Sequence, residues 1–194
     1  MSEKLIVRHC SPTLAGLKTG SLFPCPCPAG NPEEILAFIR NMNRTLSKKG
    51  IRVVPMRFTG NNILIYLYRP ARLKRDLCHP LACRVLTENG YTCGSAEQCV
   101  GCLMRRLREG HGNEDFPHEI GLFLGYPPED VCGFIDSKTG HTAPPCKCTG
   151  CWKVYGDEVR AQKLFAQYKK CTAVYCAHHA NGDSLDKLTV KESV

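Results

Sequence analysis

The sequence has no long apolar segment. Its longest strongly apolar run, Ile63 to Tyr68, has six residues, whereas a helix that spans a membrane needs roughly 20. Residues 1–10 carry Lys4 and Arg8 around only three apolar residues, so they lack the apolar region of a secretory signal peptide. These absences predict a cytoplasmic protein with no membrane partner.

The sequence also lacks the motifs that identify common enzymes. His118-Glu119 begins like the zinc-protease motif H-E-x-x-H, but position 122 is Leu, so the second histidine is missing. Gly121 and Gly125 belong to no phosphate-binding glycine pattern that follows a strand. The sequence therefore identifies no reaction, and it decides neither for nor against an enzyme.

The composition is that of an ordinary globular protein. The chain has 194 residues, of which 43% are hydrophobic and 23% are charged, which predicts one domain over residues 1–194. The net charge of +8 is concentrated, because Arg40 to Glu109 holds 14 Lys or Arg against four acidic residues. Few aromatic residues lie among these charges, so nucleic acid is not an expected partner.

The apolar pattern predicts an α+β fold, with a small antiparallel sheet covered by several helices in a single compact domain. Residues 51–58 and 63–68 are rich in β-branched and aromatic side chains, which predicts a hairpin near 51–68. Capping residues and helical spacing predict helices at 32–50, at 70–89 with a break or kink at Pro80, at 95–109 and 118–124, from 128, and at 157–179. Residues 1–30 are predicted to form short irregular elements, with a brief helix near Ser11 and an extended segment at 23–28. Residues 136–151 are predicted to be a cysteine-bearing loop.

Fourteen cysteines are the unusual feature of the composition. In a reducing compartment they indicate metal binding, redox chemistry or burial. The pattern Cys146-x-Cys148-x-x-Cys151 places three thiols in a glycine-containing loop, where they could hold zinc or an iron–sulfur cluster. His141 or Cys132 would supply the fourth ligand. The alternatives are unliganded thiols and thiol redox chemistry.

A second, weaker metal candidate is the cluster of Cys93, Cys99 and Cys102. Cys99 and Cys102 are one helical turn apart and share a helix face. Ser95 is the predicted N-cap, which puts Cys99 at the fourth helical position, where the dipole lowers a thiol pKa less than at the first. Burial as small apolar side chains beside Leu103 and Leu107 is therefore favoured over a redox dithiol.

A different hypothesis places an anionic small ligand in a pocket. His118, Glu119, Tyr126 and Trp152 would line this pocket, and Arg69 and Arg72 would bind the anion. The simpler interpretation is that Glu119 complements a helix dipole while its neighbours pack in the core. A third hypothesis is a structural or partner-binding protein with incidental thiols, whose partner the sequence does not identify.

The chain resembles an uncharacterised bacterial family, domain of unknown function thirty-seven ninety-three in the numbered series, found largely in anaerobic Gram-positive bacteria. The resemblance rests on His118-Glu119-Ile120-Gly121-Leu122-Phe123-Leu124-Gly125-Tyr126-Pro127, on Asp130-Val131 with Gly133-Phe134-Ile135, on Gly150 with Trp152-Lys153-Val154-Tyr155-Gly156-Asp157, on Tyr168-Lys169-Lys170-Cys171, and on Cys10 with Pro12-Thr13-Leu14-Ala15-Gly16. It covers nearly the whole chain and implies an intracellular single-domain protein. The family brings no established activity, and its recurring pattern does not include the cysteine clusters, which would then be a feature of this member.

Overall fold

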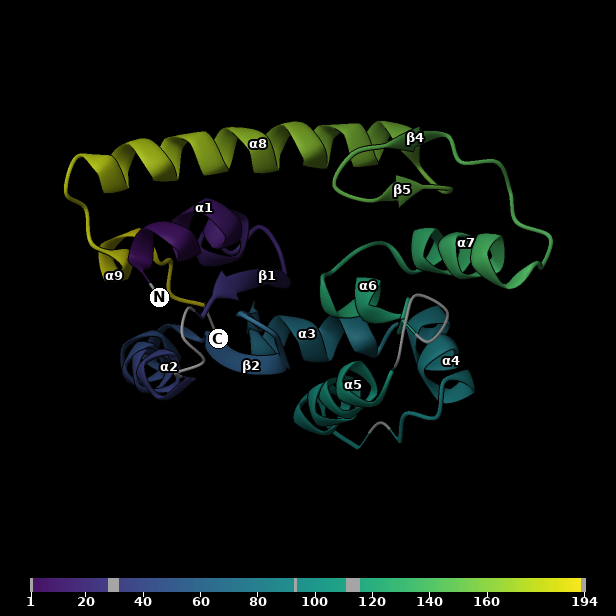
Figure 1. Cartoon of the computed structure of the whole chain (residues 1–194). Coiled ribbons are helices and arrows are strands. Elements are labelled where there is room, and N and C mark those ends of the chain that lie inside the picture. Colours follow the sequence, from purple (N-terminus) through teal and green to yellow (C-terminus); the bar gives the residue numbers. More distant parts are fainter. Residues whose placement is uncertain (1, 28–31, 93, 111–115, 193–194) are drawn as a thin grey trace. The chain divides into compact units, whose positions relative to one another are not determined.

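The computed structural model of the chain describes residues 2–27, 32–92, 94–110 and 116–192. The chain divides into two compact units. Unit 1 comprises Met1–Arg72 and Lys170–Val194, and unit 2 comprises Leu73–Lys169. Helices occur together with a small antiparallel sheet (Figure 1), so the predicted α+β class is confirmed. One domain over residues 1–194 stays a prediction.

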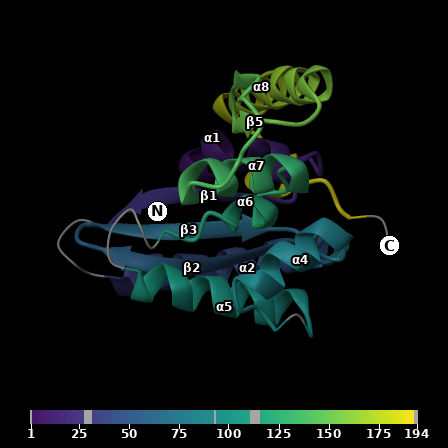
Figure 2. The ribbon, with the colours of Figure 1, turned by 90° about the vertical axis from the view of Figure 1, so that its right-hand side faces the viewer.

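Unit 1 contains the larger of the two described sheets. Its strands are β1 (Gly20–Pro26), β2 (Arg52–Thr59) and β3 (Asn62–Tyr68), and its helices are α1 (Glu3–Leu14), α2 (Pro32–Leu46), the 3-10 helix η2 (Ser47–Lys49) and α9 (Leu185–Leu188). The strands are antiparallel in the order β1-β3-β2 (Figure 2). The β2–β3 hairpin confirms the one predicted near 51–68. β3 is the central strand, as its continuous apolar sequence indicated.

The N-terminal part of the chain is more regular than predicted. α1 starts at Glu3 and runs through Pro12 to Leu14, whereas only a brief helix near Ser11 was expected. Pro12 lies inside this helix, so α1 lacks the one i→i−4 hydrogen bond that a backbone N–H at this position would form. The extended segment was expected, but its pairing with β3 as strand β1 was not. β1 is an edge strand, the position in a sheet that tolerates prolines such as Pro24 and Pro26.

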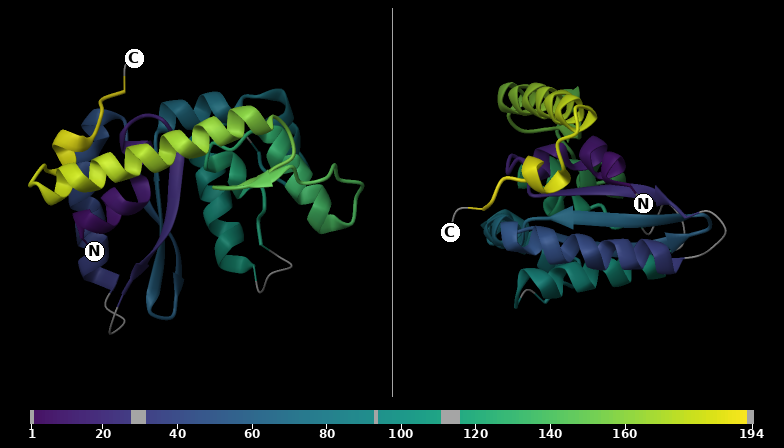
Figure 3. Two further views of the ribbon diagram at one scale, coloured as in Figure 1. Left: turned by 90° about the horizontal axis from the view of Figure 1, so that it is seen from above. Right: turned by 90° about the vertical axis from the view of Figure 1, so that its left-hand side faces the viewer.

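The core of unit 1 lies on one face of the sheet. Alternate residues of β3 point to this face, where they meet apolar residues of α1, α2 and α9. The fully buried members include Ile63, Ile65 and Leu67 of β3, Ile6, Cys10 and Leu14 of α1, and Leu46 of α2. α1 and α2 both lie on the same side of the strands (Figure 3).

Arg69 is a buried hydrogen-bond donor at the end of β3. Its side chain is 1% exposed. Nε donates to the carbonyl of Thr13 over 2.7 Å, and Nη2 donates to those of Leu14 and Val190, both over 2.8 Å. One guanidinium group thus joins the C-terminal end of α1 to the C-terminal segment of the chain.

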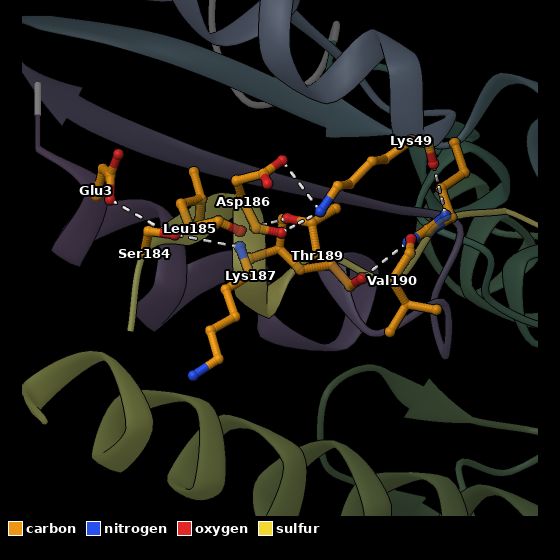
Figure 4. Close-up of polar contacts among 10 residues, drawn as sticks. Glu3, Lys49, Ser184, Leu185, Asp186, Lys187, Thr189 and Val190 are labelled. Atoms are coloured by element: carbon orange, nitrogen blue, oxygen red, sulfur yellow. Dashed lines mark hydrogen bonds and ion pairs between the residues drawn. The ribbon is translucent and has the colours of Figure 1, made fainter. Parts of the chain in front are cut away.

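Polar contacts also hold α9 in unit 1 (Figure 4). Nζ of Lys49 lies 3.0 Å from Oδ1 of Asp186. The N-cap Ser184 accepts a hydrogen bond from the backbone N–H of Lys187 over 3.3 Å. The backbone N–H of Leu185 donates to Oε2 of Glu3, also over 3.3 Å. The C-terminal segment is therefore fixed to both α1 and the end of η2.

Unit 2 is mostly helical. Its elements are α4 (Pro80–Glu88), α5 (Ala96–Glu109), α6 (Ile120–Phe123), α7 (Pro128–Thr139) and the two-stranded antiparallel sheet of β4 (Cys148–Thr149) and β5 (Lys153–Val154). The predicted N-cap of α5 is confirmed, because Ser95 Oγ accepts from the N–H of Gln98 over 3.2 Å. The predicted loop at 136–151 was too long, since α7 continues to Thr139 and Cys148 already belongs to β4.

Two helices pass from one unit to the other, α3 (Pro70–Leu77) and α8 (Glu158–Ala180). α8 corresponds to the helix predicted at 157–179. In the part of the chain that the structure describes, neither α8 nor any other helix is long and apolar enough to cross a membrane.

Candidate functional site

The candidate site is built around the buried carboxylate of Asp130 in the first turn of α7. Its side chain is 2% exposed. Oδ2 accepts the indole N–H of Trp152 over 2.7 Å, and Oδ1 accepts the backbone N–H groups of Tyr155 and Gly156, each over 2.7 Å. These three donors compensate the buried charge. Asp130 therefore fixes the β4–β5 hairpin and the Trp152 ring against α7.

Glycines allow close packing around this centre. A Cβ on Gly150 would lie 2.3 Å from the ring of Phe165, and one on Gly133 would lie 2.5 Å from the ring of Tyr155. A Cβ on Gly121 would lie 2.8 Å from a methyl group of Val131. Real Cβ atoms do not approach so closely, so Gly150 permits the hairpin to approach Phe165 of α8, while Gly133 and Gly121 permit α7 to approach Tyr155 and α6.

A pocket of about 290 Å³ opens beside Asp130. Its walls are mainly apolar, and they include the rings of Phe116, His118, Tyr126, Phe134 and Trp152 together with Lys153. Of the predicted pocket residues, His118 and Tyr126 precede α7 in the sequence and Trp152 follows it. The structure brings all three to this one pocket. Their role in ligand binding stays a prediction.

The aromatic wall is held in a fixed arrangement. Tyr126 stacks on Trp152 with ring centroids 4.7 Å apart, and Trp152 meets Phe165 edge to face at 4.5 Å. The hydroxyl of Tyr126 donates to the carbonyl of Cys151 over 3.2 Å. Burial, and then the neighbouring Cys151 thiol, raise the pKa of Tyr126 to about 12. Tyr126 is therefore a neutral donor at physiological pH.

His118 and two lysines surround Phe134 at the pocket. The His118 ring meets Phe134 edge to face at 5.1 Å. Nζ of Lys138 and Nζ of Lys153 lie 5.8 Å and 5.7 Å from the Phe134 ring centroid, within the range of cation–π contacts. Burial, and then the charge of Lys138, lower the pKa of His118. This end of the pocket thus combines a neutral imidazole with two ammonium groups.

Glu119 does not line this pocket. It is 2% exposed and its Oε1 accepts the hydroxyl of Tyr91 over 2.8 Å. Nε of Arg106 lies 2.8 Å from the same oxygen, an ion pair whose angle does not suit a hydrogen bond. Burial, and then the Glu119 carboxylate, raise the pKa of Tyr91. Within unit 2, Glu119 thus joins α5, α6 and the segment after α4.

The two arginines predicted to bind an anion bond to backbone carbonyls instead. Both belong to unit 1. Arg69 holds the contacts with Thr13, Leu14 and Val190 described above, and Arg72 donates to the carbonyl of Gly16. We therefore assign them a structural part and leave them out of the candidate site.

The predicted metal ligands do not form a cluster. Cys146 and Cys151 are exposed, and Sγ of Cys146 lies 3.3 Å from the carbonyl oxygen of Cys148. His141 is exposed and its Nδ1 lies 2.8 Å from Thr139 Oγ1. Among the described residues, no three His, Cys, Asp or Glu side chains could together hold a metal ion. Zinc or iron–sulfur binding by these side chains stays a prediction.

Two of these thiols have an environment that disfavours the thiolate. Desolvation, and then the carboxylate of Glu158, raise the pKa of Cys148. Burial raises the pKa of Cys132, the other proposed fourth ligand. A thiol must lose its proton to bind a metal ion or attack as a nucleophile. Neither cysteine is activated in this structure.

The second cysteine cluster is part of a helix. Cys99 is 2% exposed beside Leu103 and Leu107, at 1% and 2%, which confirms that it is a core residue. Cys102 is half-buried and its sulfur accepts from Arg105 over 3.5 Å. Cys93 lies outside the described residues.

Sequence reasoning missed several residues of the site. Asp130, Phe134, Lys138 and Lys153 were given no role in a site. A signal existed for Asp130, because it lies within a stretch that resembles the family. A carboxylate that is buried there needs hydrogen-bond donors. No sequence signal places Lys138 and Lys153 near the same ring, that of Phe134, since this depends on how the β4–β5 hairpin meets α7.

Comparison with known proteins places the chain in a family without assigning an activity. Searches of curated proteins and of solved structures find no match. A family model matches residues 6–189, which include every side chain of the candidate site. The sequence stretches His118–Pro127, Asp130–Ile135 and Gly150–Asp157 contribute most of the pocket lining. The chain belongs to the family described as "Protein of unknown function (DUF3793)".

Proposed function

We propose that unit 2 is a binding module for a small planar ligand, which enters the pocket between α6, α7 and the β4–β5 hairpin. The observation that carries this proposal is the arrangement of Tyr126 and Trp152 as a stacked pair that forms one pocket wall. Pockets lined by aromatic side chains with a few polar groups are typical of small-molecule sites.

The pocket fits a small ring system. Its volume of about 290 Å³ is at the lower end of the range for small-molecule pockets, roughly 300–1,000 Å³. Flat aromatic walls favour a flat ligand, because offset-stacked and edge-to-face contacts both require a ring. A ligand of one or two fused rings satisfies both conditions.

The pocket is organised before a ligand binds. Asp130 fixes the Trp152 indole, and the carbonyl of Cys151 fixes the Tyr126 hydroxyl. Side chains held in this way lose little conformational entropy on binding, so more of the contact free energy contributes to affinity. A wall that served only for packing would not need an open pocket in front of it.

Trp152 makes the proposal directly testable, because it is the single tryptophan of the chain and it lines the pocket. Titration with benzoate, indole, 2-naphthoate, 2-naphthamide and adenine should change the Trp152 emission for at least one bicyclic compound, with saturation. Isothermal titration calorimetry on the same compounds checks that the change reports binding.

A pair of variants localises the binding. We expect Phe134→Ala to weaken the affinity of the bound compound roughly tenfold, the loss expected from one aromatic contact. Phe58→Ala is the matched control, because Phe58 is 46% exposed and belongs to unit 1. Absence of saturable binding for all five compounds, or equal affinity losses in both variants, would refute the proposed function.

A further inference from the structure

The charges beside the pocket carry an inference about the class of ligand. We propose that Lys138 and Lys153 select a ligand whose ring bears an anionic group, a small aromatic carboxylate or phosphate. This inference rests on the proposed function, because it assigns the polar end of the same ligand. In this inference Lys138 and Lys153 take the place of Arg69 and Arg72 as the positively charged residues that bind the anion.

The two ammonium groups converge on one ring of the pocket wall. Both lie within 5.8 Å of the centroid of Phe134, and the charge of Lys138 also acts on His118. Two positive charges near one part of the pocket wall make the electrostatic potential there positive. An anion at the Phe134 end of the pocket would be attracted to both of them.

Among the described residues, no ion pair with a carboxylate neutralises Lys138 or Lys153. The carboxylate of Asp130 lines the pocket, but the indole N–H and two backbone N–H groups already engage its oxygens. The two ammonium groups are therefore available to a ligand.

A neighbouring pocket of about 440 Å³ shares Phe116 and His118 with the first. Its charged lining residues are mainly acidic. Glu109 and Glu119 line it together with Arg106, and Arg106 is already paired with Glu119 at 2.8 Å. Two carboxylates against one paired guanidinium disfavour an anion. The anionic group of the ligand therefore belongs beside Lys138 and Lys153.

The position of the lysines also suits a ligand with its ring inside and its charge outside. Lys138 and Lys153 are exposed, so the anionic group remains partly hydrated and does not have to be desolvated fully. The ring occupies the apolar interior against Tyr126 and Trp152. Carboxylate and phosphate share this chemistry, and matched compounds distinguish them.

The decisive comparison uses 2-naphthoate and 2-naphthamide, which have the same ring and nearly the same shape but differ by one charge. We expect the wild-type protein to bind 2-naphthoate about tenfold more tightly, the gain that two partly exposed ion pairs provide. The ratio should fall as the salt concentration rises, because exposed charges are screened. 2-Naphthyl phosphate in the same titration shows which anion is preferred.

The variants then test the lysines. In the double variant Lys138→Met and Lys153→Met, the ratio of the two affinities should fall to about one while the affinity for 2-naphthamide stays within about twofold. Lys163→Met is the matched control, because Lys163 is an exposed lysine of α8 that does not line the pocket.

The outcomes separate this inference from the proposed function. If the carboxylate and the amide bind the wild-type protein equally, or if the preference survives in the double variant, the inference is wrong while pocket binding stands. If no compound binds at all, the proposed function itself fails. A thermal-unfolding scan of each variant confirms that a lost preference does not come from a lost fold.

Discussion

Asp130 and Trp152 are joined by a hydrogen bond of 2.7 Å between two buried side chains. The other oxygen of Asp130 accepts the backbone N–H groups of Tyr155 and Gly156, the two residues that follow β5. One carboxylate therefore sets both the course of the β4–β5 hairpin and the orientation of the indole ring that it carries. The stability of unit 2 and the shape of its pocket depend on the same residue.

The first prediction concerns Asp130→Asn. The amide oxygen can still accept from Tyr155 and Gly156, but the amide N–H group would face the indole N–H of Trp152, which is also a donor. Leaving such a buried donor without an acceptor costs about 1–3 kcal/mol. We expect urea unfolding to show a loss of this size, together with a shift of the Trp152 emission to longer wavelength.

Asp136→Asn is the control for this substitution. Asp136 lies on the same helix, and its side chain is 40% exposed. Its unfolding free energy should stay within about 0.5 kcal/mol of the wild type. If Asp130→Asn is no less stable than Asp136→Asn, then Asp130 does not hold the hairpin.

The second prediction compares two glycine substitutions of opposite expected sign. In Gly150→Ala the new Cβ would lie 2.3 Å from the Phe165 ring, and Phe165 also contacts Trp152. Displacing this ring should destabilise the protein by about 1–3 kcal/mol. In Gly101→Ala, within α5, the new Cβ meets nothing within 4 Å, and the better helix propensity of alanine should add about 0.8–1 kcal/mol.

Thermal unfolding of the two variants and the wild type measures both effects in one experiment. The expected order of midpoints is Gly101→Ala, wild type, Gly150→Ala. A Gly150→Ala variant as stable as the wild type would show that the hairpin can move away from α8, and the pocket wall would then not be rigid.

Local patterns in the sequence predicted much of the fold. The β-branched run at 63–68 indicated β3, Ser95 marked the start of α5, and apolar spacing gave nearly the full length of α8. These features depend on neighbours within a few residues, which a single sequence contains. The missed strand β1 has Pro24 and Pro26, which remove hydrogen-bond donors and resemble a loop until its edge position in the sheet is known.

The site was predictable only in part, for a physical reason. His118, Tyr126 and Trp152 stood out by residue type, and all three line the pocket. The partners of Arg69 could not be inferred, because Thr13 and Val190 contribute backbone carbonyls, which every residue has. The thiols near Cys148 suggested a metal site by spacing alone, whereas convergence of side chains depends on the three-dimensional path of the hairpin.

The third prediction concerns Arg69→Lys. An ammonium group cannot reach the three carbonyls of Thr13, Leu14 and Val190 that the planar guanidinium joins. At least one buried carbonyl is left without a partner, so the free energy of unfolding should fall by about 2–4 kcal/mol. Urea unfolding measures this, and Arg40→Lys, at an exposed position of α2, should change it by less than about 0.5 kcal/mol. Equal effects in the two variants would contradict the structural part assigned to Arg69.

The fourth prediction is a pH dependence from His118. Burial, and then Lys138, lower its pKa below the usual 6.5, while Glu119 acts in the opposite direction. As the pH falls through 6.5, the unfolded chain therefore takes up this proton before the folded protein does. The contribution of His118 to stability is complete above pH 6.5 and is lost as the pH falls through the folded pKa.

A substitution isolates this effect, because other groups also titrate between pH 7.5 and pH 5. His118→Asn removes the ionisable group, so its unfolding free energy should decline less than that of the wild type over this interval. Phe58→Ala, at an exposed position without an ionisable group, should decline as the wild type does. Identical declines in wild type and His118→Asn would mean that His118 binds its proton equally in both states, which would contradict a pKa lowered by burial and by Lys138. A steeper decline in His118→Asn would mean that the folded protein favours the imidazolium, so that the Glu119 carboxylate would outweigh burial and the Lys138 charge.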